Sequence, residues 1–398
     1  MKTLNNCIVL LLLLGTFSCG STSNDKESQN NNASSTTTTE EIGGNPGQGK
    51  EVQIDTALTA FSNFLAANER FTTFQDSTLR NRFLKWAEDN KVKYEKIKAN
   101  RLDKISKWNE ENMKALNSNH QSFLFYPLAG GDFIHMSFLF PEAKEYLMLA
   151  LEPVGSVPVK NGSLGSFEMD YLMDVDKVLR NIYRQSYFVT KNMNSDMGES
   201  TKVNGVLPLI LWGMGKTDHS IVSLSYFDID STGQKCAVQN PKKPTGVRIE
   251  FIKNGTSLVK SLEYLSMNVA NSAWKSNPRN KRYLENAVPQ GCNSFIKSAS
   301  YILHYRSFSE MRDLILSKTK FHLQDDTGIP YTYFDSTFTA SLFGEYIVPV
   351  EDFDPKLFQK DLDVAYKDES KYKGDLPFSM GYHWGSRKQN QMIFSRPE

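Results

Sequence analysis

The spacing of apolar residues along the chain changes near residue 119. Between residues 51 and 118, apolar side chains recur three or four positions apart, as at Leu79, Phe83 and Trp86. Most other positions in this segment are polar or charged, and it contains no glycine or proline. This periodicity is typical of amphipathic helices, so we predict a helical region over residues 51–118.

From residue 119 onward, short apolar runs alternate with turns rich in glycine and proline. We predict two strands joined by a Gly-rich turn in SFLFYPLAGGDFIHMSFLF, and a strand buried on both faces in EYLMLALEPVGSVP. Further strands are predicted in GVLPLILWG, SIVSLSYFDI and GVRIEFIK, and helices over residues 166–190 and in FIKSASYILHY and SFSEMRDLIL. Because strands and helices do not alternate strictly, we predict an α+β fold, with a largely antiparallel sheet packed with helices, in one globular unit over residues 51–398.

The first fifty residues have the pattern of an export signal followed by a tether. Lys2 precedes an apolar run from Ile8 to Leu14, and the small residues Gly15, Thr16 and Ser18 lie between this run and Cys19. We predict a signal peptide over residues 1–18, which is too short to span a membrane. The segment also resembles a bacterial lipobox, although Thr16 stands where leucine is usual. Residues 19–50 are too polar to bury a core, so we predict a disordered tether that begins at a lipidated Cys19.

This reading predicts a lipid-anchored protein of the cell envelope, at the outer membrane, with plain secretion as the alternative. The charge of the whole chain is balanced, with 46 basic and 45 acidic residues, and no basic stripe suggests nucleic acid. The expected partners are therefore the membrane, through the anchor, and an envelope protein or glycan.

Two cysteines, Cys236 and Cys292, remain beyond the predicted signal and anchor. An exported chain meets an oxidising compartment, so these two residues could form a disulfide. They could equally be two unpaired, buried small side chains. The sequence leaves both alternatives open.

Several polar residues interrupt the apolar strands and are candidates for a site. Asp132 follows two glycines, with Tyr126 before them and His135 after; the three residues Gly-Gly-Asp could bind a ligand or simply form a turn. Glu152 ends a very apolar strand, where a buried carboxylate requires a partner.

The segment LQDDTGIP contains two adjacent acids, Asp325 and Asp326. Turn formation explains Asp326, Gly328 and the proline, but it does not require a second acid or the preceding Gln324. We therefore take Asp325 and Asp326 as catalytic candidates together with Asp132 and His304. Tyr126, Glu152, Arg306 and Gln324 are the ligand-binding candidates.

The segment WGMGKTDH contains the Gly-Lys-Thr triplet of phosphate-binding loops. Such a loop needs a further glycine five positions before the triplet, and Ile210 stands there. We predict instead a polar turn between two apolar strands. No complete cofactor or metal motif is found, so we predict no cofactor and no metal.

Five segments together resemble an uncharacterised family of exported bacterial proteins: FYPLAGGDF, FPEAKEYLMLALEPVG, KSASYILHY, LQDDTGIPYTYF and FGEYIVPV. The resemblance extends from about residue 55 to the end of the chain. It implies an exported protein with one folded unit, and it implies no activity, cofactor or partner.

Two functions follow from these observations. The first is a membrane-tethered envelope protein that binds a ligand or partner without catalysis. The alternative is a hydrolase for glycans or other envelope substrates, in which Asp132 and one of Asp325 and Asp326 share acid and base roles. A third hypothesis is that the buried polar residues have a purely structural role.

Overall fold

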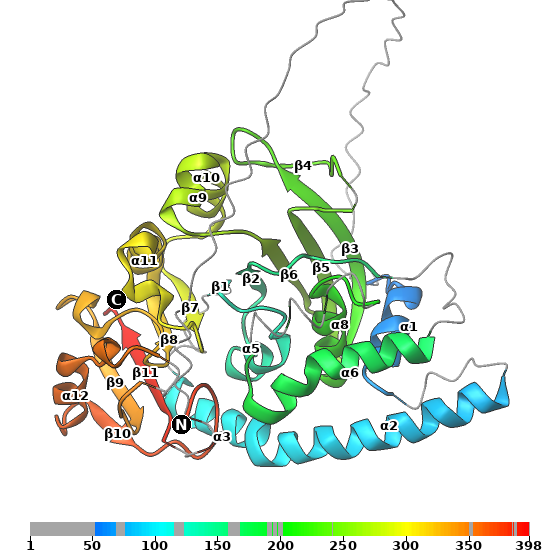
Figure 1. Cartoon of the computed structure of the whole chain (residues 1–398), viewed down its shortest axis with the longest axis horizontal. Coiled ribbons are helices and arrows are strands. Elements are labelled where there is room, and N and C mark those ends of the chain that lie inside the picture. Colours follow the sequence, from blue (N-terminus) through cyan, green and yellow to red (C-terminus); the bar gives the residue numbers. More distant parts are fainter. Residues whose placement is uncertain are drawn as a thin grey trace, which may run out of the picture. The chain divides into compact units, whose positions relative to one another are not determined.

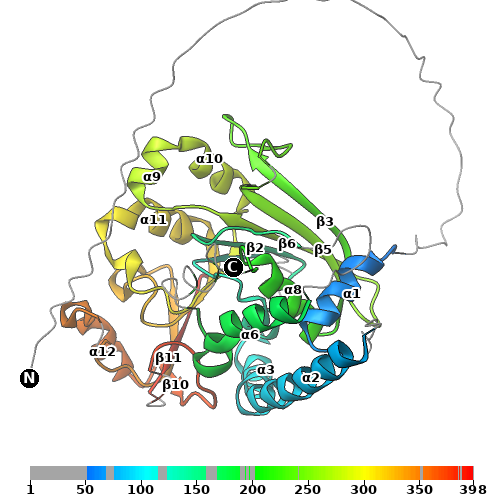
Figure 2. The same ribbon diagram turned by 45° about the vertical axis from the view of Figure 1, so that its right-hand side comes forward.

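The structure is a computed structural model that describes residues 52–68, 76–114, 123–157, 168–188, 193, 197, 202–240, 242–349, 353–383, 385 and 388–397. The predicted signal peptide, Cys19 and the tether lie outside these residues. Residues 51–398 form one compact unit. In the described part of this unit, helices cover both faces of a sheet (Figures 1 and 2).

The described strands form one eleven-stranded sheet. In order across the sheet, its strands are β10 (Tyr372–Gly374), β9 (Thr339–Gly344), β11 (Asn390–Ser395), β8 (Thr319–Gln324), β7 (Cys292–Ile296), β1 (Phe123–Pro127), β2 (Glu145–Ala150), β6 (Val259–Ser266), β5 (Gly246–Lys253), β3 (His219–Ile229) and β4 (Lys235–Cys236).

The five central strands, from β8 to β6, are parallel to one another. Antiparallel pairs occur toward both edges, in β6–β5–β3–β4 on one side and in β8–β11–β9 on the other. The prediction of strands packed with helices is thus confirmed, but the prediction of a largely antiparallel sheet is wrong. The sheet is mixed. The prediction failed because a long insertion between β2 and β6 obscures the regular alternation of strands and helices in the sequence.

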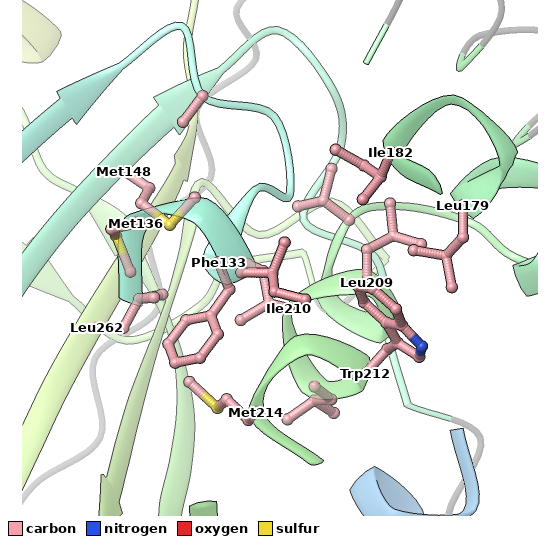
Figure 3. Packing of buried hydrophobic residues seen from close by; sticks show 14 of the residues in the cluster. Phe133, Met136, Met148, Leu179, Ile182, Leu209, Ile210, Trp212, Met214 and Leu262 are labelled. Atoms are coloured by element: carbon pink, nitrogen blue, oxygen red, sulfur yellow. The ribbon is translucent and has the colours of Figure 1, made fainter. Parts of the chain in front are cut away.

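One face of the sheet is covered by helices that lie before residue 217. They are α1 (Thr56–Leu65), α2 (Ser77–Ile97), the π-helical segment η1 (Lys98–Leu102), α3 (Asp103–Asn112), α5 (Phe133–Leu139), α6 (Glu168–Gln185) and α8 (Leu207–Lys216). Figure 3 shows how Leu209 and Trp212 of α8 lie near Leu179 and Ile182 of α6, while Phe133 of α5 lies on the sheet side.

The opposite face is covered by helices from the second half of the chain. They are α9 (Asn271–Ser276), α10 (Pro278–Ala287), α11 (Ser309–Lys318) and α12 (Lys360–Tyr366), with short 3₁₀ turns η2 (Ile302–His304), η3 (Arg306–Phe308), η4 (Tyr331–Tyr333) and η5 (Pro355–Leu357) between elements. Covering on both faces explains why β2 is apolar on both sides, as parallel strands usually are.

Two segments predicted as strands are helices. FIHMSFL forms α5 because Asp132 caps its first turn, and Asp132 Oδ1 accepts a hydrogen bond from the His135 backbone N–H. LPLILWGMGK forms α8, with Pro208 in its first turn, so the predicted turn around Gly215 lies inside a helix. FIKSASYILHY was predicted to be helical, but it contains the end of β7 followed by a tight loop and η2.

The cysteines are both free thiols. Cys236 is half-buried on β4, and Cys292 is buried at the start of β7. The disulfide that the sequence allowed is not formed in the structure.

Candidate functional site

The central parallel strands reverse their order of addition at β1. After β1 the chain adds β2 and then β6 on one side, and it later adds β7 and β8 on the other side. In sheets of this kind, the helices that follow neighbouring strands diverge at the point of reversal and leave a crevice at the carboxyl ends of the strands. The crevice is expected next to Pro127 of β1 and Ile296 of β7.

A cavity of about 460 Å³ lies at this edge of the sheet. Its walls come from the residues that follow β1, β2 and β7, and from four aromatic side chains. These four are Tyr187, Phe188, Phe353 and Tyr382, and Tyr126 of β1 adds a fifth aromatic ring. The volume is in the range of small-molecule sites in proteins.

A buried cluster around Asp132 forms the floor of this cavity. Asp132 Oδ1 lies 2.7 Å from His135 Nδ1, and its Oδ2 accepts hydrogen bonds from Tyr126 Oη at 2.9 Å and Lys297 Nζ at 2.5 Å. Burial alone would raise the pKa of Asp132, but His135 and Lys297 outweigh burial and hold this pKa below its usual value. Burial also lowers the pKa of His135 to about 4, so its ring is neutral at pH 7.

Glu152 occupies a different kind of position, just after β2. Its side chain lines the cavity and the residue is only 3% exposed. Among the described residues, its carboxylate has no hydrogen-bond or ion-pair partner. Its carboxylate therefore faces the cavity, where its oxygens can accept hydrogen bonds from a bound ligand.

The loop after β7 has an unusual backbone. Ser298, Ser300 and Tyr301 all have positive φ values, between 52° and 56°. Leu128, after β1, has a φ of 62° and also lines the cavity. Non-glycine residues rarely adopt this conformation, and such strain concentrates at functional sites.

The two acids of LQDDTGIP hold this loop in place. Asp325 Oδ2 accepts the backbone N–H of Ser298 at 2.8 Å, and Thr327 Oγ1 accepts that of Ala299 at 2.7 Å. Asp326 Oδ2 accepts the hydroxyl of Tyr301 at 2.6 Å. Neither acid lines the cavity, so both act from behind its wall.

Gln324 closes the turn that carries these acids. Its Oε1 accepts the Ile329 backbone N–H and its Nε2 donates to the Ile329 carbonyl, both at 2.7 Å. Gln324 is fully buried and does not line the cavity. The excess polarity of this segment therefore reflects support for the neighbouring loop.

The other predicted residues divide between the cavity and its surroundings. Tyr126, Asp132 and Glu152 line the cavity. His304 is half-buried with its ring edge-on to Tyr301, 5.2 Å between centroids, and Arg306 is exposed on η3; neither lines the cavity.

The sequence analysis missed two kinds of site residue. Lys297 directly follows the buried strand β7. A lysine beside such an apolar run could have been recognised in the sequence as a candidate site residue. The aromatic side chains of Tyr187, Phe353 and Tyr382 come from loops that only the fold brings together.

Comparisons with models of known families and with curated proteins give no match for this chain. In the described residues, no helix is long and apolar enough to cross a membrane. The described part of the chain also contains no group of three or more His, Cys, Asp or Glu side chains that could hold a metal ion.

Proposed function

We propose that this protein binds a nucleoside-type ligand, a base carried on a ribose, in the cavity beside β1 and β7. The strand order supports the proposal, because doubly wound sheets bind nucleotides where the order reverses. In those proteins an acid about 20 residues after the glycines of the first turn binds the ribose hydroxyls. Glu152 stands about 20 residues after Gly130 and Gly131, at the end of the second strand.

The unpaired carboxylate of Glu152 is the observation that carries this proposal. Two neighbouring ribose hydroxyls would donate to its two oxygens and provide the donors that the described residues lack. A structural acid in this fold behaves differently. Glu263 on β6 is also buried, but it accepts hydrogen bonds from Lys235, Arg248 and Tyr283.

The aromatic side chains of the cavity wall can bind the base of the proposed nucleoside by stacking. Tyr187 and Tyr382 lie edge-on with 4.7 Å between ring centroids, and Phe353 lies 5.2 Å from Tyr382. A flat base can stack on such a wall and bury apolar area without further polar partners.

A second candidate function follows from the position of β11. The last strand lies antiparallel between β8 and β9, next to the five parallel strands. This arrangement of seven strands is shared with methyltransferases that use S-adenosylmethionine, itself a nucleoside. The likeness is one of strand order alone, and it makes methyl transfer a proposal by analogy of fold.

The carboxylate hydrolase suggested by the sequence has less support. Of its three acids, Asp132 lines the cavity, while Asp325 and Asp326 bind the loop after β7 and Asn390 of β11. Glycoside hydrolysis needs two carboxyl groups facing one substrate. A loss of glycan hydrolysis in Asp325→Asn, with an unchanged fold, would support that alternative.

Titration calorimetry with adenosine tests the binding proposal. We expect saturable binding to the purified protein and a loss of at least tenfold in affinity in Glu152→Gln. Leu151→Trp, at an exposed position on the cavity wall, should also weaken binding by obstructing the cavity. Absence of binding by adenosine and by S-adenosylmethionine would contradict the proposal.

We also propose that the folded unit is held at the cell envelope by a lipid on Cys19. Growth with labelled palmitate should label the natural protein and leave a Cys19→Ala variant unlabelled. A protein that is secreted without label would support the alternative of plain export.

A further inference from the structure

We infer that the cavity selects nucleosides without a 5′-phosphate, and that it favours a neutral or positively charged group at that position. This inference rests on the proposed nucleoside binding and adds the chemical class of the ligand. It comes from the charges around the cavity and from the way the first helix after β1 begins.

Phosphates in doubly wound folds usually bind at the N-terminus of the helix that follows the first strand. Here that helix, α5, has only seven residues and begins at Asp132. The carboxylate of Asp132 lies at the helix start and faces its first turn. A negative group therefore occupies the place where a phosphate would need free N–H donors.

Lys297 does not offset this negative charge for an incoming ligand. Its ammonium donates to Asp132 Oδ2 and to the Ser186 carbonyl oxygen, and it lies 3.4 Å from His135 Nδ1. Two of its three N–H donors go to these oxygens, and the ion pair with Asp132 neutralises its charge, so it attracts a phosphate only weakly. Its charge is paired with Asp132.

The balance of charge in the cavity is consequently negative. The charged residues along the described wall are Asp132, Glu152 and Lys297, which sum to −1. Arg101 lies nearby, but its guanidinium donates to the carbonyl oxygens of Ser379, Ile182 and Arg184 and does not line the cavity. In a partly enclosed cavity, a phosphate would meet unpaired like charge and lose its hydration.

Three probes with the same base and ribose test this inference by calorimetry at pH 7. Adenosine is neutral at the 5′ position, 5′-amino-5′-deoxyadenosine is positive, and AMP is negative. We expect AMP to bind at least tenfold more weakly than adenosine, and the amino compound to bind at least as tightly as adenosine.

A matched pair of variants separates charge from shape. Leu151 lines the cavity and is 60% exposed, so it tolerates a polar side chain. The ratio of AMP affinity to adenosine affinity should be severalfold higher in Leu151→Lys than in Leu151→Gln. This result would support the conclusion that charge causes the weaker binding of AMP. An equal ratio in the two variants would contradict the charge inference.

The outcomes distinguish the two proposals. Binding of AMP as tightly as adenosine, in the wild-type protein, overturns the charge inference and leaves nucleoside binding standing. Binding of none of the three probes, nor of S-adenosylmethionine, overturns the proposed function and this inference together.

Discussion

Replacing Glu152 by glutamine should make the ligand-free protein more stable. The residue is 3% exposed, its carboxylate has no partner among the described residues, and it lines the same cavity as Asp132. Leaving a buried charged group unpaired costs at least about 1–3 kcal/mol. Glutamine keeps the shape and removes the charge, so we expect a gain of about 1–2 kcal/mol in the free energy of unfolding at pH 7.

Glu263→Gln is the matched control, because Glu263 is also a buried acid of the sheet but is fully engaged. Glu263 accepts from Arg248 Nη1 at 2.8 Å and Tyr283 Oη at 2.6 Å, and also from Lys235. Each hydrogen bond to a charged group contributes about 1.5–3 kcal/mol, less where the partner is exposed to solvent as Lys235 and Arg248 partly are. We expect this variant to lose about 2–4 kcal/mol.

Urea unfolding followed by tryptophan fluorescence measures both variants, first without ligand and then with adenosine. A ligand present at 100 times its Kd adds about 2.7 kcal/mol to the stability of the protein that binds it. The same adenosine concentration adds only about 1.4 kcal/mol to a variant that binds tenfold more weakly, so adenosine should narrow the difference between the two proteins by about 1.3 kcal/mol. If Glu152→Gln is destabilised as much as Glu263→Gln, the carboxylate supports the fold and our reasoning about the cavity is wrong.

Three further predictions concern the support of the site. Asp132→Asn should cost about 3–5 kcal/mol in unfolding free energy, because it leaves Lys297 buried without its counter-ion, and adding Lys297→Met should recover part of this loss. Burial and the adjacent acid raise the pKa of Asp325 to about 7, above its unfolded value, so folding favours the protonated form. In thermal unfolding, stability should therefore fall as the pH rises from about 4 to about 8, and Asp325→Asn should flatten this slope. Gly155→Ala should destabilise the protein by about 3 kcal/mol in the same assay, because Gly155 has a φ of 78° and a Cβ there would lie 2.7 Å from Gly205 Cα. An unchanged stability would contradict this close packing.

The helices α1, α2, α3 and α6 could be predicted from periodicity, but α5, α8 and the direction of the strands could not. The apolar segment EYLMLA indicated a strand buried on both faces, and a parallel arrangement follows from that observation more directly than an antiparallel one. The insertion between β2 and β6, which includes the β3–β5 hairpin, obscured the pattern. Strand direction depends on which segments become neighbours in space, and local spacing does not record this.

Only part of the candidate site could be predicted from the sequence. Asp132 and Glu152 stood out because each is polar at the end of an apolar strand, and this is where parallel strands place ligand-binding residues. Asp325 and Asp326 also stood out, yet their hydrogen bonds go to the loop after β7. Sequence alone marks an excess of polar groups, and only the fold shows whether they face a cavity or brace its wall.

The position of β11 has a consequence for how the protein is made. Residues 390–395 fill the gap between β8 and β9, and Asn390 binds Asp326 behind the cavity wall. Ribosomes synthesise this strand after both of its neighbours, so neither neighbour can complete its hydrogen bonding until synthesis has passed residue 395. The sheet and the support of the cavity wall therefore stay incomplete until β11 has taken its place between β8 and β9.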